Sequence, residues 1–248
     1  MFRVGYWILR QGEDLSLAGG AMPARAKQTL VTYETILNDA EARALIDMAD
    51  AYLDAIGYTD HGISHVGRVS AAARRIVTDL GLAERDAELA AVAGLIHDVG
   101  NVIHRNDHAR TSALMAFDIL KRLDMPLAEI ATVAGAIGNH DEEDGEAVSV
   151  PCAALIIADK CDVNRIRVRN RNMIHFDIHD RVNYAVEQSA LKVDRAARTI
   201  TLELAIDTSI SQVMEYFEIF QRRMKISRRA AQYLNCDFRL VMNGTALS

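Results

Sequence analysis

The chain has 248 residues, of which half are apolar and a quarter are charged, and its formal net charge is −6. This length allows one large domain or a domain with an appendage, and the apolar content is sufficient for a core. Because non-specific nucleic-acid binding depends on many Lys and Arg residues, we expect no nucleic acid among the partners of this acidic chain.

The cysteines and the N-terminal segment indicate a cytoplasmic protein. Cys152, Cys161 and Cys236 are far apart, odd in number and outside any CxxC motif, so they are expected to be reduced. No apolar run is long enough to span a bilayer. Residues 1–26 do not resemble a signal peptide, and we expect this extension to be poorly ordered, with Met22 as an alternative start.

Apolar residues at helical spacing predict a series of helices in the first two thirds of the chain. Asn38 and Glu41 are predicted to form a capping box for a helix over residues 40–56, which Gly57 ends. Further helices are predicted over residues 63–80, 84–99, 108–123 and 127–137, and from Pro151 towards Ile166. Residues 101–107 and the acidic segment NHDEEDGE are expected to be loops.

The pattern changes after residue 168. The segment SALKVDRAARTITLELAID is rich in β-branched residues and predicts two strands around a polar turn. A long helix over residues 211–234 and a last strand in CDFRLVM follow. We therefore predict a mainly α protein, with a helical domain over residues 27–168 and a small α+β appendage over residues 169–248.

The helical region contains six potential metal ligands on five consecutive predicted elements. These residues are His65, His97, Asp98, His108, His140 and Asp159. A helical bundle can bring side chains from several helices to one point in its interior. Imidazole and carboxylate groups suit divalent ions such as Fe, Mn, Mg, Ni, Co or Zn, so the sequence predicts a metal centre.

The order His, His-Asp, His, His, Asp resembles that of the HD-domain superfamily of metal-dependent phosphohydrolases. The stretches HGISHVGRVS, AGLIHDVGN and ALIIADKCD carry this resemblance, which covers roughly residues 57–165. It implies that His65, His97, Asp98 and Asp159 hold one divalent ion. It also implies that Asp98, His108 and His140 hold a second, with Asp98 as the bridge.

Two alternatives for the second ion remain open. His108 and His140 are outer groups if the site holds a single ion. The segment ADKCDVNR resembles bacterial HD hydrolases of dinucleoside polyphosphates, but the gap between Asp98 and His108 is shorter here, so His104 is a rival ligand.

The resemblance implies hydrolysis of a small phosphorylated substrate, with nucleotides among the candidates. His97 and Asp98 would be the catalytic centre, and a metal-activated hydroxide would attack phosphorus. Cyclic-dinucleotide phosphodiesterases of the HD-GYP type are a poorer match, because Asn139 replaces one of their paired histidines and the GYP tripeptide is missing after Gly145. Two other classes remain: a di-iron oxygenase of the HD type, and a nucleotide-binding regulatory protein with a degenerate site.

Four residues are candidates for binding the substrate. Arg165, in the segment NRIRVRNRN, is the arginine nearest Asp159, and its planar guanidinium matches phosphate geometry. Lys160 follows a ligand and is expected to point about 100° away from it around the helix. His104 and Arg105 lie just after the His-Asp pair. For the arginines of NRIRVRNRN, a solvated face or pairing with the local acids is an equal alternative.

The remaining patterns have structural interpretations. His61 lies one helical turn before His65 and is expected to be a cap or an outer partner, and His175 and His179 are expected to be structural. A basic cluster is predicted to form a solvated stripe on the long helix, and consists of Arg222, Arg223, Lys225, Arg228 and Arg229. Apolar residues of that helix are predicted to pack on the helical body or on a second subunit of a homodimer, and these are Met214, Tyr216, Phe217, Ile219 and Phe220.

Overall fold

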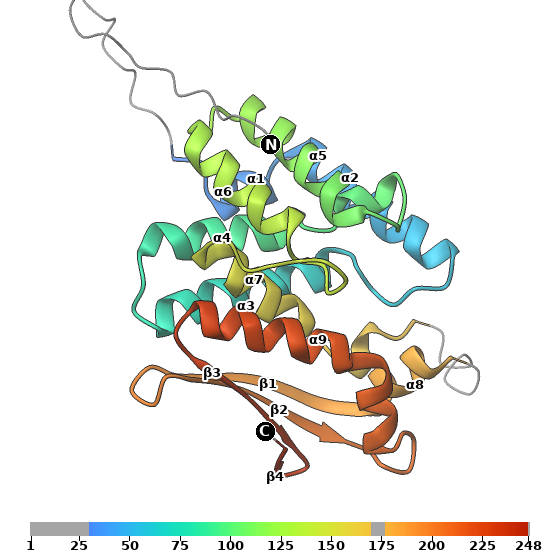
Figure 1. The fold of residues 1–248 in the computed structure, drawn as a ribbon. Coiled ribbons are helices and arrows are strands. Elements are labelled where there is room, and N and C mark those ends of the chain that lie inside the picture. The colour runs from blue at the N-terminus through green and yellow to red at the C-terminus, as the bar shows by residue number, and fades with distance from the viewer. Residues whose placement is uncertain (1–29, 170–176, 248) are drawn as a thin grey trace, which may run out of the picture.

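A computed structural model defines residues 30–169 and 177–247, and shows a helical body that packs on a small sheet (Figure 1). The mainly α prediction with a C-terminal α+β part is therefore confirmed. The N-terminal extension 1–26, the alternative start Met22, and His175 lie outside the described residues. Within the described residues, no helix is long and apolar enough to cross a membrane.

The helical body follows the predicted order, with two short 3-10 helices (η) between the α-helices. Its elements are α1 Tyr33–Leu37, α2 Ala40–Ala55, α3 Ile63–Asp79, α4 Glu84–Ile96, η1 Val99–Val102, α5 His108–Arg122, α6 Leu127–Gly138, α7 Val150–Lys160 and η2 Arg165–Arg167. Helix α7 is buried along nearly its whole length and contacts α3, α4 and α6. It is therefore the central helix of the body.

The C-terminal part consists of α8 Ile178–Ala185, α9 Val213–Tyr233 and a sheet of four strands within the described residues. The strands are β1 Val186–Asp194, β2 Thr199–Ile206, β3 Asp237–Met242 and β4 Thr245–Ala246. The strand order is β1-β2-β3-β4, and β2 pairs with β3 in parallel while the other two pairs are antiparallel. Helix α9 connects the parallel pair and lies between the sheet and the helical body (Figure 1).

The start of α2 differs from the prediction by one residue. The N-cap is Asp39, whose carboxylate accepts from the amide of Ala42 at 2.9 Å. Asn38 instead ends α1, an unpredicted helix, and its side-chain amide donates to the carbonyl of Glu34 at 2.8 Å. Two cap-forming residues stand side by side here, and only the preceding helix decides which of them begins α2.

The helix that carries the His-Asp pair ends earlier than predicted. Helix α4 stops at Ile96, His97 is its C-cap, and Asp98 leaves the helical conformation at φ −107° and ψ 2°. Gly100 is required for packing, because a Cβ there would lie 2.5 Å from both the carbonyl of His108 and the amide of Ser112. The chain therefore passes close under the first turns of α5.

The end of the Asp159 helix is also earlier than predicted. Helix α7 ends at Lys160, and Asn164 caps the separate helix η2 by accepting from the amide of Ile166 at 3.1 Å. The prediction of one helix towards Ile166 is wrong because Asn164, a good cap residue, starts a new element instead of continuing the old one. The arginines that follow consequently do not share a helix with Asp159.

The basic cluster of α9 is exposed, as predicted, except for the half-buried Arg223, and three of its arginines also form ion pairs with an acidic segment. Arg223 contacts Glu142 at 3.2 Å, and Arg222 approaches Glu143 at 3.8 Å. Arg229 forms an ion pair with Glu146. The acidic segment NHDEEDGE thus lies against the basic side of α9, which a sequence pattern cannot reveal because the two segments are about 80 residues apart.

The apolar residues of the body and of the sheet form one continuous core. Tyr216 and Phe220 of α9 are buried, as predicted, whereas Met214 is exposed. On β2 and β3, alternate residues face this core, and the polar outer face includes an ion pair of 2.6 Å between Lys192 and Glu203. The predicted appendage is therefore built onto the helical body through α9.

Candidate metal centre

The six candidate ligands are delivered to one region by consecutive elements of the body. His65 belongs to the first turn of α3, His97 and Asp98 follow the last turn of α4, and His108 is the first residue of α5. His140 follows α6 and Asp159 lies in the last turn of α7. All four histidines are at most 4% exposed, so the region is an interior site.

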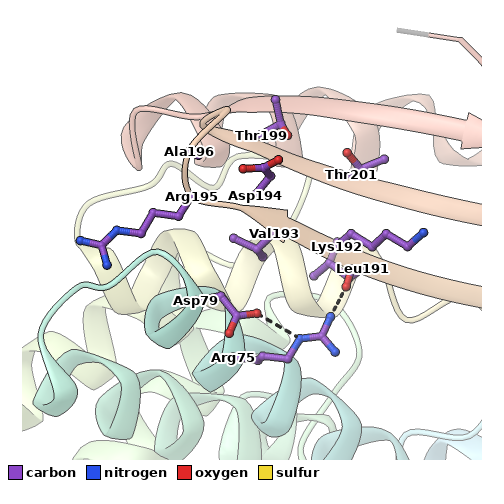
Figure 2. Close-up of a pocket in the computed structure, with 10 residues that line it drawn as sticks. All are labelled: Arg75, Asp79, Leu191, Lys192, Val193, Asp194, Arg195, Ala196, Thr199 and Thr201. Atoms are coloured by element: carbon purple, nitrogen blue, oxygen red, sulfur yellow. Dashed lines mark hydrogen bonds and ion pairs between the residues drawn. The ribbon is translucent and has the colours of Figure 1, made fainter.

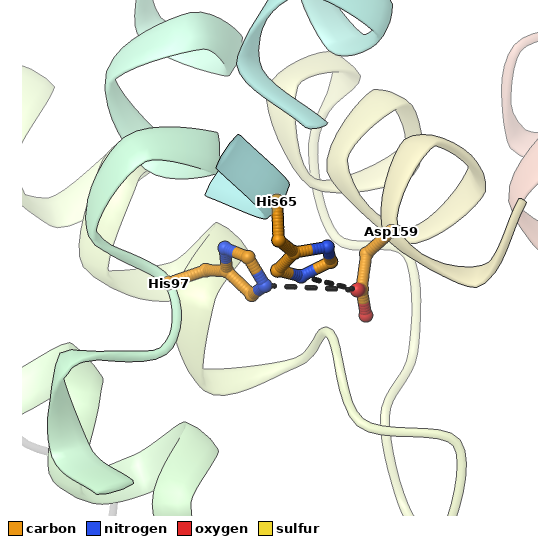
Figure 3. A group of neighbouring side chains, drawn as sticks. All are labelled: His65, His97 and Asp159. Carbon is orange, nitrogen blue, oxygen red and sulfur yellow. Dashed lines mark ion pairs between the residues drawn. The ribbon is translucent and has the colours of Figure 1, made fainter. Parts of the chain in front are cut away.

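His65, His97 and Asp159 form the first group of ligand atoms, which point toward one another (Figure 3). The Oδ1 atom of Asp159 lies 3.5 Å from Nε2 of His65 and 3.6 Å from Nε2 of His97. The Oδ2 atom of Asp98 joins them, at 3.8 Å from His65 and 3.4 Å from His97. Two imidazoles and two carboxylates therefore face one point.

A second group lies on the other side of Asp98. Its Oδ1 atom is 3.4 Å from Nε2 of His108, which is 3.2 Å from Nε2 of His140. His97, Asp98 and His140 also bring one ligand atom each within 4.8 Å of one another. The two oxygens of Asp98 thus face two different sets of imidazole nitrogens.

The Nδ1 atoms of the histidines are held by groups outside the centre. His97 and His140 contact the carbonyls of Gly94 and Ile137 at 2.9 and 2.6 Å, and His108 contacts that of Arg105 at 3.2 Å. An Nδ1–H donor to a carbonyl leaves the Nε2 lone pair directed into the centre. This is the tautomer that a metal ion requires.

His65 is oriented by Asp162, a residue that the sequence analysis did not assign. Its Nδ1 lies 2.7 Å from Oδ2 of Asp162, and Arg68 donates to the same carboxylate at 2.9 Å. Asp162 follows Asp159 by three residues in the quoted segment ADKCDVNR, which is the signal that could have identified it. A carboxylate behind a ligating histidine is a recurrent feature of metal sites.

An observation that is independent of the resemblance to HD-domain proteins shows that these ligand atoms fit a metal ion. The Nε2 atoms of His65 and His97 are buried without a hydrogen-bond partner. A buried nitrogen without a partner is costly, and here two of them face carboxylate oxygens at distances too long for good hydrogen bonds. A cation between these atoms would satisfy all of them.

The ionisation states of the two carboxylates and of His140 agree with this fit. Burial alone would raise the pKa of Asp98, but His97, His61, His108 and Arg105 hold it well below its usual range. Burial would likewise raise the pKa of Asp159, which Lys160, His65 and His97 lower well below its usual range. Burial lowers the pKa of His140 well below its usual value. Ionised carboxylates and a neutral imidazole are the forms that bind metals.

Lys160 does not point away from the ligand that precedes it, contrary to the sequence-based expectation. Its ammonium is 2.8 Å from Oδ2 of Asp159 and 2.5 Å from Oε2 of Glu142, and the residue is 5% exposed. Glu142 in turn accepts from Nε of Arg223. The flexible side chain of Lys160 folds back because the buried carboxylates attract it, and it orients Asp159.

The other three predicted substrate residues lie in different surroundings. Arg105 lies beside the centre, with Nη1 at 4.0 Å from Oδ1 of Asp98. His104 is exposed and accepts from the amide of Asn106, so the structure does not bring it to the other ligands. Arg165 contacts Glu187 at 3.3 Å in the C-terminal part, because η2 turns it away from Asp159.

A hollow of about 850 Å³ lies beside the β1–β2 hairpin, away from the ligands. Figure 2 shows Arg75 directed towards Asp79, at 3.6 Å, and towards the carbonyl of Leu191. The guanidinium of Arg195 lies against Gly81. The charged residues of this open hollow are thus engaged with the protein, and none of the six candidate ligands lines it.

Comparison with known proteins shows which family model the helical body matches. Residues 62–164 match the family model of the HD domain, and this range includes all six candidate ligands. The chain therefore contains a region, residues 62–164, that matches the HD domain.

Two individual proteins are similar to the chain. An uncharacterised protein of Methanocaldococcus jannaschii is 22% identical over 207 residues, which are 74% of this chain and 80% of that protein. The crystal structure of a predicted HD superfamily hydrolase from an uncultured Thermotogales bacterium shares 25% sequence identity, and the match covers 50% of this chain and 67% of that one. Its TM-score of 0.40 is too low to bear on the fold.

Proposed function

We propose that this protein is a metal-dependent phosphohydrolase that cleaves a phosphate ester, with nucleotides as the first candidates for substrate. The observation that carries this proposal is the placement of Asp98. One of its oxygens faces His65 and His97, and the other faces His108. A carboxylate between two sets of imidazoles is suited to bridge two divalent ions.

The residues of the chain would divide the work as follows. His65, His97, Asp98 and Asp159 would hold one ion, and Asp98, His108 and His140 the other. Divalent ions in such a pair supply Lewis acidity, which acidifies water and neutralises charge on a phosphoryl group.

Arg105 would bind a phosphoryl oxygen of the substrate. Its guanidinium lies beside Asp98, and within the described residues its only hydrogen bond is from Nη1 to Asn101 at 3.2 Å. The remaining N–H groups are therefore available to an anion. Lys160 holds Asp159 in place from behind, and Asp162 does the same for His65.

The test measures metal content and hydrolysis for the full-length protein and for Asp98→Ala. Mononucleotides, dinucleoside polyphosphates and cyclic dinucleotides are each supplied with Mn²⁺ or Fe²⁺. We expect hydrolysis of at least one substrate, and we expect Asp98→Ala to lose metal at both positions and activity by about 100-fold or more. Asp118→Ala, an exposed acid of α5, is the matched control and should resemble the wild type.

Two results would contradict the proposal. Full activity of Asp98→Ala would show that the centre is elsewhere. Failure to cleave any phosphate ester, together with a mixed-valent iron pair in the visible spectrum that consumes O₂, would favour the oxygenase alternative.

A further inference from the structure

A cleft of about 360 Å³ lies between the HD domain and the C-terminal helices, next to the metal centre. On the HD side it is lined by Tyr58, His61 and Arg105, and on the other side by Asn183 of α8 and Arg223 of α9. His61 links the cleft to the centre, since its ring lies 5.4 Å from that of His65. We call this space the seam cleft.

Two arginines of the seam cleft have N–H groups that form no hydrogen bond within the described residues. Arg223 donates from Nε to Glu142 at 3.2 Å, and its carbon Cζ lies over the ring of Phe220, 4.6 Å from the ring centre. Within the described residues, its Nη1 and Nη2 atoms have no hydrogen-bond partner, and the side chain is 24% exposed. Arg105, at 27% exposure, likewise keeps free donors.

The side-chain oxygen of Asn183 is independent evidence that the seam cleft binds a ligand. The residue is 6% exposed, and its Nδ2 donates to the carbonyl of His179 at 2.8 Å, which defines the orientation of the amide. Its Oδ1 atom is then buried without a partner. Because a buried acceptor of this kind is costly, a ligand with a hydroxyl or amine donor would satisfy it.

The charges around Arg105 favour an anion on the side of the seam cleft. A neighbouring hollow shares Tyr58 and Arg105 but is lined by five exposed or half-buried acids, namely Asp107, Asp141, Glu142, Glu143 and Asp144. In the seam cleft the acids are Asp177 and Asp180, of which Asp177 caps α8 and lies 3.3 Å from His179. The buried Arg167 adds positive charge, although its donors are occupied by the carbonyls of Asp60 and Asp162.

We propose that the seam cleft binds a second phosphoryl group of the substrate through Arg105 and Arg223. This inference rests on the proposed function, since the first phosphoryl group would react at the metal centre beside Asp98. A planar guanidinium can donate two parallel bonds to a phosphate, which makes two arginines a strong site for it. The substrate class is thus a compound with at least two phosphoryl groups, and α9 of the C-terminal part selects it.

The test compares two anions by calorimetry with the metal-loaded full-length protein. Imidodiphosphate carries two phosphoryl groups and resists hydrolysis, and inorganic phosphate carries one. We expect imidodiphosphate to bind more tightly than phosphate. Arg223→Gln should weaken imidodiphosphate by about tenfold or more, because bonds between charged groups are lost, and phosphate by less than about twofold.

Arg222→Gln is the matched control. Arg222 is the preceding residue of α9, its side chain is 72% exposed, and it does not line the seam cleft. Both affinities should equal those of the wild type. Metal content is measured for every variant, because Arg223 also contacts Glu142. If Arg223→Gln loses metal, Arg223→Lys is decisive: it keeps a cation beside Glu142 but lacks the planar fork, and should weaken imidodiphosphate severalfold.

Equal affinities for the two anions would overturn the inference, and so would equal losses in Arg222→Gln and Arg223→Gln. Its failure differs from failure of the proposed function. Hydrolysis of a simple phosphate monoester without any preference for imidodiphosphate would refute the seam cleft alone. The expected preference without hydrolysis of any phosphate ester would refute the hydrolase alone.

Discussion

At the scale of single residues, the side chains that contact the candidate ligands from outside the centre are as important for the proposed metal binding as the ligands. Asp162 contacts His65 at 2.7 Å and receives two bonds from Arg68. Burial would raise the pKa of Asp162, but His65, Arg167 and Arg68 hold it well below its usual range. An ionised carboxylate therefore stands behind His65 and fixes the orientation of its Nε2 atom.

Asp162→Asn tests this arrangement. The amide can still contact Nδ1 of His65 but lacks the negative charge, so we expect affinity for the metal to fall by about 10- to 100-fold. Competition with a chelator of known affinity measures the change. Asp79→Asn, an exchange at the far end of α3, should have no effect. Equal affinity of the wild type and Asp162→Asn would show that Asp162 does not tune the site.

The state of the three cysteines is a further property at the scale of single residues. Cys152, Cys161 and Cys236 are all free and buried, as expected of reduced cysteines. Burial raises the pKa of Cys152 to about 11. Since the thiolate is the reactive form, these residues are protected in the folded protein and have no part in the proposed chemistry.

At the scale of elements, close packing of η1 beneath α5 sets the distance between Asp98 and His108. Gly100 donates from its amide to Oγ of Ser112 at 2.8 Å, so the two segments are in direct contact. A side chain at Gly100 would force them apart, because the nearest atoms are backbone atoms of α5. The second group of ligand atoms therefore depends on a glycine.

Gly100→Ala should destabilise the protein by about 1–3 kcal/mol, the usual cost of overpacking. Gly67→Ala is the matched control in α3, where a Cβ would meet nothing within 4 Å. That variant should be neutral or stabilised by about 0.5–1 kcal/mol, since alanine favours a helix. Urea unfolding measures both. A stable Gly100→Ala protein with full metal content would contradict the packing argument.

The first turn of α9 depends on a carboxylate. Glu215 accepts from Arg181 at 2.6 Å, from the hydroxyl of Ser211 at 2.8 Å and from the amide of Gln212 at 3.1 Å. The bond from Arg181, with that from Ser211, lowers the pKa of Glu215 from 4.5 to about 2. The folded state thus binds this proton less readily than the unfolded state.

The sign of the pH dependence follows from this depressed pKa. The contribution of Glu215 is complete above its unfolded pKa of 4.5 and is lost as the pH falls towards about 2. We expect Glu215→Gln to be less stable than the wild type at pH 7, and the difference to shrink between pH 4.5 and pH 2. Thermal unfolding across this range measures it, and a difference independent of pH would refute the role of the charge.

At the scale of the whole molecule, the helical body and the C-terminal part depend on each other. Helix α7 is buried nearly all round, with the other body helices on one side and α9 on the other. Arg223 and Arg229 of α9 also anchor the acidic segment that follows His140. Removing the C-terminal part would expose apolar surface of α7. It would also remove the contacts that hold the acidic segment next to His140, a candidate ligand.

A truncated protein that ends at residue 169 is therefore expected not to fold to a stable monomer. Exposed core surface of this kind leads to aggregation or to loss of fixed packing. Gel filtration and near-UV circular dichroism would detect either outcome. A monomeric truncated protein with native-like spectra and bound metal would show that the HD domain is independent of α9.

The sequence by itself was sufficient for the helical succession, the mainly α class and the likeness to the HD domain, because periodic apolar residues and the His, His-Asp, His, His, Asp order are local signals. It was also sufficient to select six ligand candidates that the structure brings together. Boundaries were less well predicted, as Asn38 and Asp39 show, because neighbouring cap residues compete.

Only the tertiary structure decided which distant residues support the centre. Asp162, Glu142 and Arg223 act through contacts that arise when α7, the acidic segment and α9 pack together. Arg165 is the nearest arginine to Asp159 in the sequence after α7, yet η2 turns it towards Glu187. Once a helix ends, nearness in sequence no longer determines where a side chain points. The packing of two buried faces against each other does determine it.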